Sequence, residues 1–318
     1  MLLLGSCGNK ERESLQGPGE IPVRSSQDRD NRQAEAVSLL GKPLYPPENI
    51  PEILLKKHDE ALEYWNNDKE DVQNWIWYGR HLAYTGQYRK SIEIYTQAIE
   101  KFPDEPRLYR HRGHRYITIR KFQKAISDFK KSAELFEGQE DTIEPDGLPN
   151  SKNIPLSTLQ GNVWYHLGLA YYLENNMELA YTAYRKSLAT SNNDDMKVAC
   201  IYWLYMIKMR MGDEQEADEI IKPVHAGMDI IENMAYHKLC LFYKDEISEE
   251  ALAEGNKGLA GYMEDAFGYG LGNRHFWQGN KAEAEKQWKH VLDNSDWASF
   301  ASIAAEADYA RFFADPGS

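Results

Sequence analysis

Cysteine is scarce in this sequence of 318 residues, where Cys7, Cys200 and Cys240 are the only three. Cys200 and Cys240 lie far apart, each within an apolar pattern typical of a helix. No two cysteines have the CxxC or other spacing of a metal or redox site. We therefore expect Cys200 and Cys240 to be buried as small apolar side chains, with no role for cysteine chemistry in function.

Long apolar runs and an excess of positive charge are also missing. No stretch approaches the about 18 apolar residues that a membrane-spanning helix needs. The 37 basic and 50 acidic residues give a formal net charge of −13. A chain this acidic is poorly suited to wrapping nucleic acid or to lying on anionic lipid. The hydrophobic share of 42% is nevertheless enough to form a core, so the sequence predicts a folded protein.

The N-terminus carries a short pattern of its own. Leu4-Gly5-Ser6-Cys7 resembles a bacterial lipobox, and that resemblance implies a lipid anchor on Cys7 and a place at the bacterial cell envelope. The sequence departs from the lipobox family in having no basic segment and only a short apolar run before the motif. The residues that follow the motif, up to Gln33, are hydrophilic and are predicted to form a flexible tether, so that segment 1–33 is the lipobox-like start and its tether. If Cys7 is not a lipobox cysteine, the segment is a frayed terminus and the expected location is cytoplasmic.

Three units of the central sequence share one pattern of aromatic and small residues. In the unit that starts at Val72, positions 4, 8, 20, 27 and 32 are Trp75, Gly79, Ser91, Ala98 and Pro103. The unit from Pro106 has Tyr109, Gly113, Tyr116, Ala125 and Phe129 at positions 4, 8, 11, 20 and 24. The unit from Gly161 has Trp164, Leu167, Gly168, Tyr171, Ala180 and Tyr184 at positions 4, 7, 8, 11, 20 and 24. This pattern resembles the tetratricopeptide repeat, a helical hairpin of 34 residues.

The residue types in the pattern have a physical reason. A small residue at position 8 and another at position 20 let the two helices of a hairpin approach closely, and the large aromatic residues fill the space that remains. The resemblance implies an all-α, right-handed solenoid of antiparallel helical hairpins. Within a repeat domain over 34–318, we expect clear repeats at 72–105, 106–137 and 161–194. Degenerate repeats are expected at 195–231 and 265–294, with a closing helix at 299–312.

One segment interrupts the repeats. Residues 138–158 contain three prolines and several turn residues, which predict an ordered loop and not a further helix. Leu148 and Ile154 are two apolar side chains of this segment that are expected to anchor it. Ser157 or Thr158 is expected to cap the helix that follows. A loop of this length within a repeat array is usually functional or disordered.

The repeat resemblance also indicates which side chains line the concave groove. In that family, positions 2, 5, 9 and 12 of the first helix face the groove, and they select the candidate residues Arg80, Arg107, Arg110, His114, Tyr165 and Tyr172. Trp164 and Tyr171 are instead expected in the core. Arginine forks bind carboxylate, phosphate or sulfate groups in two-point contacts, so an anionic ligand or an acidic peptide is the expected occupant. The alternative is that these arginines pair with the acidic residues of the insert.

Arg112 stands at position 7, where the repeat family has leucine. A buried arginine must be paired, so a structural charge network is expected around it. His111 and His114 are three residues apart on one helix, but no third ligand is near in the sequence, and neither a metal nor a cofactor is expected.

Two functions remain open from the sequence. The first is a scaffold that binds a protein or peptide partner in its groove, which needs no catalytic motif. The second is an enzyme or small-ligand receptor with a site beneath the 138–158 insert, built from Arg107, Arg110, His114 and Tyr165. No motif of the chain supplies a reaction, so the sequence favours binding over catalysis.

Overall fold

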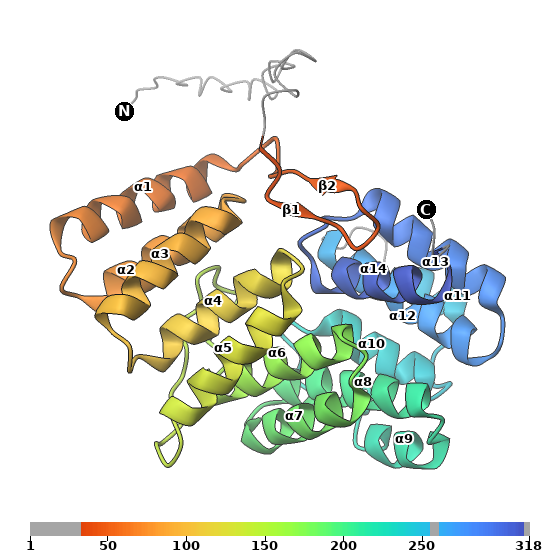
Figure 1. The fold of residues 1–318 in the computed structure, drawn as a ribbon. Helices are drawn as coiled ribbons and strands as arrows, with labels where there is room; N and C mark the ends of the chain where they lie inside the picture. Colours follow the sequence, from red (N-terminus) through yellow and green to blue (C-terminus); the bar gives the residue numbers. More distant parts are fainter. Residues whose placement is uncertain (1–32, 255–260, 315–318) are drawn as a thin grey trace, which may run out of the picture. The chain divides into compact units, whose positions relative to one another are not determined.

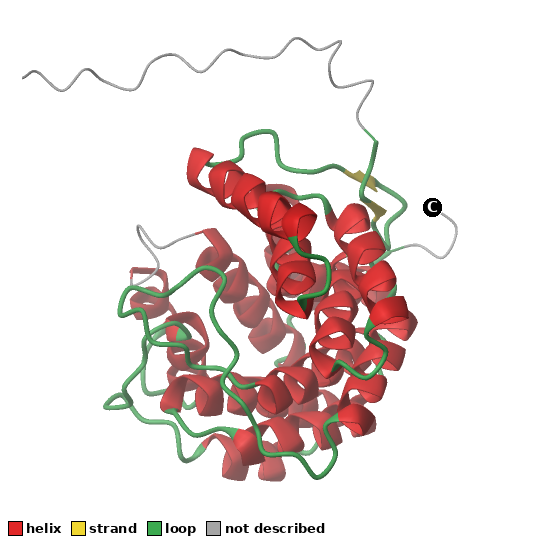
Figure 2. Cartoon of the chain, turned by 90° about the vertical axis from the view of Figure 1, so that its left-hand side faces the viewer, coloured by secondary structure: helices red, strands yellow, loops and turns green. Residues whose placement is uncertain are grey.

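The computed structural model describes residues 33–254 and 261–314, and the compact helical unit begins at Ala34. Cys7 and all but the last residue of the expected tether lie outside the described residues. Helices make up nearly all of the regular secondary structure of the described part of the chain (Figure 2), which confirms the predicted fold class. None of its helices is both long enough and apolar enough to cross a bilayer.

The helices follow one another along the chain as hairpins (Figure 1). Their bounds are α1 Glu52–Asn67, α2 Val72–Tyr84, α3 Tyr88–Lys101, α4 Pro106–Thr118, α5 Phe122–Leu135, α6 Leu159–Leu173, α7 Met177–Thr190, α8 Asp194–Met211, α9 Glu214–Ile221, α10 Met234–Tyr243, α11 Glu249–Glu254, α12 Gly261–Trp277, α13 Lys281–Asn294 and α14 Phe300–Phe312. The hairpins that follow the repeat pattern are α2–α3, α4–α5, α6–α7 and α12–α13. Helices α10 and α11 were not predicted, because the repeat pattern does not cover their sequence.

A small residue and a large ring meet at the same place in each of these four hairpins. A Cβ added to Gly79 would lie 2.4 Å from the ring of Tyr95, and one added to Gly168 would lie 2.6 Å from that of Tyr184. Gly113 faces Phe129 and Gly272 faces Trp288 in the same way. The first helix can therefore touch the aromatic ring of the second only where it has no side chain.

The turn between the two helices of a hairpin passes through the left-handed region. Glycine occupies this place at Gly86, Gly212 and Gly279, with φ between 76° and 78°. Arg120 and Asn175 occupy it at φ 60°. A left-handed conformation is unfavourable for a residue with a Cβ, so Arg120 needs a compensating interaction.

Residues before α1 form a small β-hairpin with strands of two residues each, which the all-α prediction did not include. Strand β1 (Ala36–Val37) pairs antiparallel with β2 (Pro43–Leu44). The hairpin is attached to α3, where the backbone N–H of Arg89 donates to the Glu35 carboxylate at 2.8 Å. It is also attached to α14, because the backbone N–H of Leu39 donates to Glu306 at 2.7 Å.

Candidate functional site

The insert at 138–158 is held against the repeats by one buried carboxylate. Glu144 lies with one oxygen 3.0 Å from Arg110 Nη2 and the other 3.1 Å from His111 Nε2. Asn162 donates a further hydrogen bond to the same carboxylate. Burial alone would raise the pKa of Glu144, but Arg110 and His111 lower it well below its usual range. The carboxylate is therefore ionised and links α4 to α6 through the insert.

Backbone contacts fix the same loop. The Glu144 N–H donates to Ser157 O and the Leu159 N–H donates to Thr142 O, both at 2.9 Å. Thr158 caps α6 by accepting from the Gly161 N–H at 3.2 Å. Leu148 and Ile154 are not the anchors: they are 54% and 48% exposed. Buried polar contacts hold the loop instead, which a search for apolar anchors could not find.

The remaining basic groove candidates also contact the chain itself. Arg80 Nη1 donates to the Pro145 carbonyl of the insert at 2.8 Å. Arg107 forms a two-point ion pair with Glu105, the N-cap residue of its own helix, at 2.7 Å. The His114 ring lies 4.6 Å from the His166 ring and 5.0 Å from that of Phe300. Arg80 thus contacts the backbone of the insert, and Arg107 contacts the N-cap residue of its own helix. His114 contacts rings of α6 and α14.

The prediction that Tyr165 and Tyr172 line an open groove is wrong, because both side chains are buried. Tyr165 and Tyr172 are 7% and 1% exposed. Trp203 Nε1 donates to the Tyr165 hydroxyl at 2.8 Å, and the Tyr172 hydroxyl lies 2.8 Å from that of Tyr269. Burial raises the pKa of each hydroxyl. The reason is that later helices cover this face of α6.

Helix α14 is one of those later helices and packs against α6 and α12. Arg210 of α8 binds the fully buried Asp308 carboxylate through two contacts of 2.5 and 2.6 Å. The Tyr269 hydroxyl donates to the same carboxylate at 2.7 Å. The face of the repeats that the sequence analysis assigned to a ligand is therefore occupied, around Tyr172, by the chain's own C-terminal helix.

Arg112 lies apart from these contacts. Its Nε and Nη2 each donate to the Asp128 carboxylate at 2.8 Å, and Nη1 donates to Thr96 at 3.1 Å. These bonds join α4 to α5 and α3, so the side chain that replaces the family's leucine is fully paired. Within the described ranges, no group of three or more His, Cys, Asp or Glu side chains is arranged to hold a metal ion.

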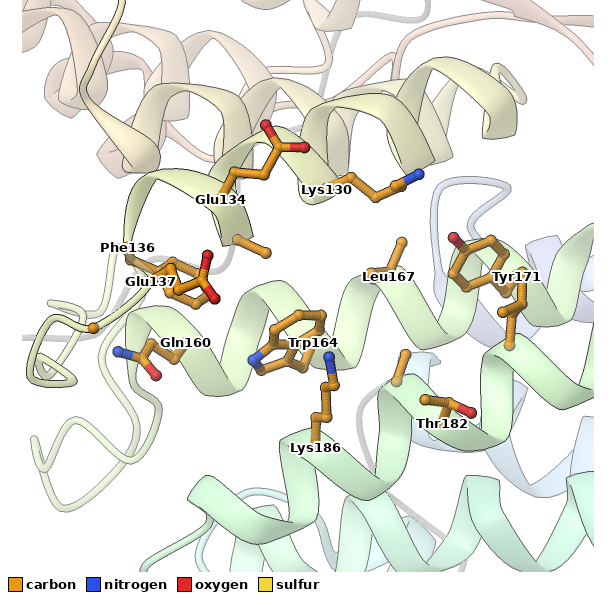
Figure 3. A pocket seen from close by; sticks show the side chains of 14 residues that line it. Lys130, Glu134, Phe136, Glu137, Gln160, Trp164, Leu167, Tyr171, Thr182 and Lys186 are labelled. Carbon is orange, nitrogen blue, oxygen red and sulfur yellow. The ribbon is translucent and has the colours of Figure 1, made fainter.

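An open cleft lies on the other side of α6, between α5 and α7. Its volume is about 520 Å³. Trp164, Leu167 and Tyr171 of α6 form its floor (Figure 3). Ala133 of α5 and the nearby Phe136 line one side, and Leu179 and Ala183 of α7 line the other. Leu179 is 43% exposed, whereas Leu167 is buried.

Charged side chains surround this apolar floor. Lys186 Nζ lies 4.0 Å above the Trp164 ring. Glu134 and Glu137 lie towards the Trp164 end of the cleft, and Lys130 lies nearer Tyr171 (Figure 3). An apolar floor with a charged edge has the chemistry of a peptide-binding surface.

The cleft was not predicted from the sequence, because Trp164 and Tyr171 were expected in the core. The equivalent ring in the first repeat, that of Trp75, is indeed buried at 6% exposure. In the third repeat the buried face of α6 is the inner one, beneath α8 and α14, so the outer aromatic side chains stay partly exposed. The sequence of α6 has apolar residues on every face of the helix, which could have indicated that some of them lie outside the core.

The 34 residues 161–194, which contain most of α6 and all of α7, match the family model of the tetratricopeptide repeat. The chain is a tetratricopeptide-repeat (TPR) protein. TPR hairpins form a scaffold for protein interaction. No curated protein matches the sequence of this TPR chain.

Two solved TPR structures are similar to this TPR chain. A tetratricopeptide repeat protein from Parabacteroides merdae is 12% identical, with a TM-score of 0.47, over 81% of this chain and 93% of that one. YrrB, a TPR protein with an unusual peptide-binding site, is 16% identical, with a TM-score of 0.41, over 77% of this chain and 98% of that one.

Proposed function

We propose that this TPR protein is an interaction scaffold that binds a short segment of a protein partner in the cleft between α5, α6 and α7. The observation that carries the proposal is the partly exposed aromatic floor formed by Trp164 and Tyr171. Aromatic side chains in a pocket are the groups that most often dominate binding energy at protein interfaces.

The size of the floor limits what can bind. Trp164 and Tyr171 are seven residues apart on one helix, which corresponds to about 10 Å along its axis. That length accommodates about two turns of a partner helix or about three residues of an extended peptide. The partner segment should place a leucine or an aromatic side chain between Ala133 and Ala183, the small residues of the two walls.

The charges at the edge of the cleft indicate how the segment is oriented. Basic side chains of the partner fit near Glu134 and Glu137, and acidic side chains fit near Lys130 and Lys186. Electrostatic complementarity of this kind acts mainly on specificity and on the association rate.

We do not place an anionic ligand or a reaction at the inner candidates. An anion at Arg110 would have to displace the buried Glu144, and one at Arg107 would have to displace Glu105. His114 and Tyr165 are packed against other rings. The four residues of the enzyme alternative are thus engaged within the chain.

A library of random twelve-residue peptides displayed on phage tests the proposal on the full chain. We expect the selected peptides to be enriched in leucine or aromatic residues next to basic ones. Leu179→Asp places a charge in the cleft and should weaken their binding at least tenfold. Leu55→Asp is the matched control, since Leu55 is also a helical leucine with 43% exposure but lies on α1. Peptides that bind Leu179→Asp as well as the unchanged protein would contradict the proposal.

A further inference from the structure

A second pocket, separate from the cleft, lies between α1, α2 and the insert. Its volume is about 320 Å³, which suits one side chain of a partner better than a whole peptide. Its lining includes Tyr64 from α1, Trp77 and His81 from α2, and Asp146 from the insert. The pocket therefore lies beneath the insert, but it uses none of the residues that the sequence analysis suggested for a site there.

Two polar atoms of the lining residues have no hydrogen-bond partner in the described part of the chain. They are Nδ1 of His81 and Oδ2 of Asp146, and both atoms are buried. The His81 side chain as a whole is only 7% exposed. Buried polar atoms in proteins are nearly always paired, so two orphan atoms beside one pocket indicate a missing partner.

The neighbouring Arg80 does not supply that partner. Its Nη1 donates to the carbonyl of Pro145 and its guanidinium group lies 4.5 Å from the Trp77 ring centroid. The Arg80 guanidinium group is not within ion-pair distance of the Asp146 carboxylate. Burial raises the pKa of Asp146 and the nearby Glu144 adds to the rise, which the charge of Arg80 opposes without cancelling it. This carboxylate therefore has less positive charge around it than its burial requires.

The charge around the pocket favours a cation as the occupant. Two carboxylates line it, those of Glu60 and Asp146, against the single ammonium group of Lys57. Burial lowers the pKa of His81 to about 4, so its imidazole is neutral at pH 7 and can accept a hydrogen bond. Tyr64 is 66% exposed and its ring lines the pocket, and aromatic rings attract ammonium and guanidinium groups. The chain as a whole carries a net charge of −13.

From these contacts we propose that the pocket between α1, α2 and the insert binds a lysine or arginine side chain of a basic protein partner. The cation would pair with the Asp146 carboxylate, donate to His81 Nδ1 and rest against the Tyr64 ring. The alkyl stem would lie along Ala61 and Trp77. This site is independent of the cleft and needs no contact with Trp164 or Tyr171.

Small model compounds test the site directly on the full chain. N-acetyl-lysine-N-methylamide and N-acetyl-arginine-N-methylamide are titrated while the indole N–H resonance of Trp77 is followed, with Trp77→Phe used to assign it. The norleucine analogue has the same alkyl stem without charge, and the glutamate analogue carries the opposite charge. We expect either basic compound to shift the resonance with saturation, and the other two analogues to bind at least tenfold more weakly.

Two variants connect the shift to the pocket. Asp146→Asn removes the charge at an oxygen atom without a partner, so the protein should keep its melting temperature while the basic compounds bind at least fivefold more weakly. Tyr64→Ala, at an exposed position, should weaken them about threefold. Leu179→Asp, in the cleft, should change nothing here, and Asp146→Asn should leave the phage-selected peptides bound. Equal binding of the norleucine analogue, tighter binding of the glutamate analogue, or no shift with any compound would overturn the proposal.

Discussion

Arg120 and Glu306 lie 186 positions apart in the sequence and form a buried two-point ion pair, with Nε and Nη2 at 3.1 and 2.9 Å from the carboxylate oxygens. The same guanidinium group donates to the Trp297 carbonyl at 2.8 Å. The pair joins the turn after α4 to the C-terminal helix α14. It explains why an arginine occupies a left-handed turn position where three other hairpins have glycine.

Replacing Arg120 with glycine should therefore destabilise the protein, although it relieves the backbone. A left-handed conformation costs a residue with a Cβ about 1–2 kcal/mol. Removing one partner of a buried ion pair costs about 3–5 kcal/mol, because the other charge stays buried without compensation. We expect a net loss of about 1–4 kcal/mol in the free energy of unfolding, the difference between those two ranges, measured by urea denaturation.

Asn175→Gly is the control for this substitution. Asn175 has the same φ of 60° in the next hairpin, and its side chain is exposed. Its replacement should change stability by no more than about 1 kcal/mol in either direction. If Arg120→Gly proves as harmless as Asn175→Gly, the ion pair with Glu306 does not stabilise the fold.

Removing the buried carboxylate of the insert should release the loop. Glu144→Ala leaves Arg110 buried without its counter-ion, and we expect a loss of about 3–5 kcal/mol in the free energy of unfolding. Trypsin should then cut after Lys152 much faster than in the unchanged protein. Glu140→Ala, at an exposed position of the same loop, should change stability by less than about 0.5 kcal/mol.

A double variant separates the ion pair from the packing of the loop. Arg110→Met combined with Glu144→Met removes both charges, so no uncompensated ion remains. It should be closer in stability to the unchanged protein than Glu144→Ala is. A double variant that is less stable than Glu144→Ala would show that the polar contacts matter beyond charge balance.

Acidification should lower stability between pH 6.5 and pH 5. Burial, reinforced by Arg110, lowers the pKa of both His111 and His166 to about 3, whereas an unfolded histidine titrates at about 6.5. The unfolded state thus binds protons in this range and the folded state does not, so stability is fully present above pH 6.5 and is lost as the pH falls. At pH 5 the loss is about 2 kcal/mol for each histidine.

Urea denaturation at pH 7 and pH 5 measures this effect. His166→Gln should reduce the pH dependence by the share of one histidine. His225→Gln, at an exposed position, should leave it unchanged. A free energy of unfolding that stays constant or rises on acidification would show that these imidazoles are not held neutral.

The close contact within the third repeat predicts a cost for Gly168→Ala. Alanine would improve the helix propensity of α6 by about 1 kcal/mol. Its Cβ, however, would lie 2.6 Å from the Tyr184 ring, which is fully buried and stacks on Trp203 at 5.9 Å. Overpacking costs about 1–3 kcal/mol, so we expect a net loss of up to about 2 kcal/mol in the free energy of unfolding, measured by urea denaturation. Arg185→Ala, exposed on α7, should be close to neutral.

The hairpins could be predicted from the sequence because their determinants are local. Gly168 and Tyr184 are sixteen residues apart, and the spacing of small and aromatic residues specifies one contact that each repeat makes within itself. The cap of α6 at Thr158 is also local. The same reasoning could not predict which face of α6 is buried, because that depends on α8 and α14, whose positions follow from contacts over long sequence distances.

The candidate site shows the same limit. One alternative from the sequence was that the acidic residues of the insert pair with the groove arginines. The ion pair between Glu144 and Arg110 is a contact of this kind. The sequence could not identify His111 or Asn162 as further partners, since their approach depends on the path of the loop. Tyr172 was assigned to the groove by its position in the repeat, but a position within one repeat carries no information on what the last helix covers.

The bond between Leu39 and Glu306 has a consequence for how the domain unfolds. In an open repeat array each repeat contacts only its neighbours, so the terminal repeats can fray independently and stability is close to a sum of local terms. Here Glu306 of the last helix, α14, accepts hydrogen bonds both from Leu39 near the start of the described chain and from Arg120 after α4. Loss of either end therefore removes contacts of the other, and the two ends should lose their protection from hydrogen exchange together, as one cooperative unit.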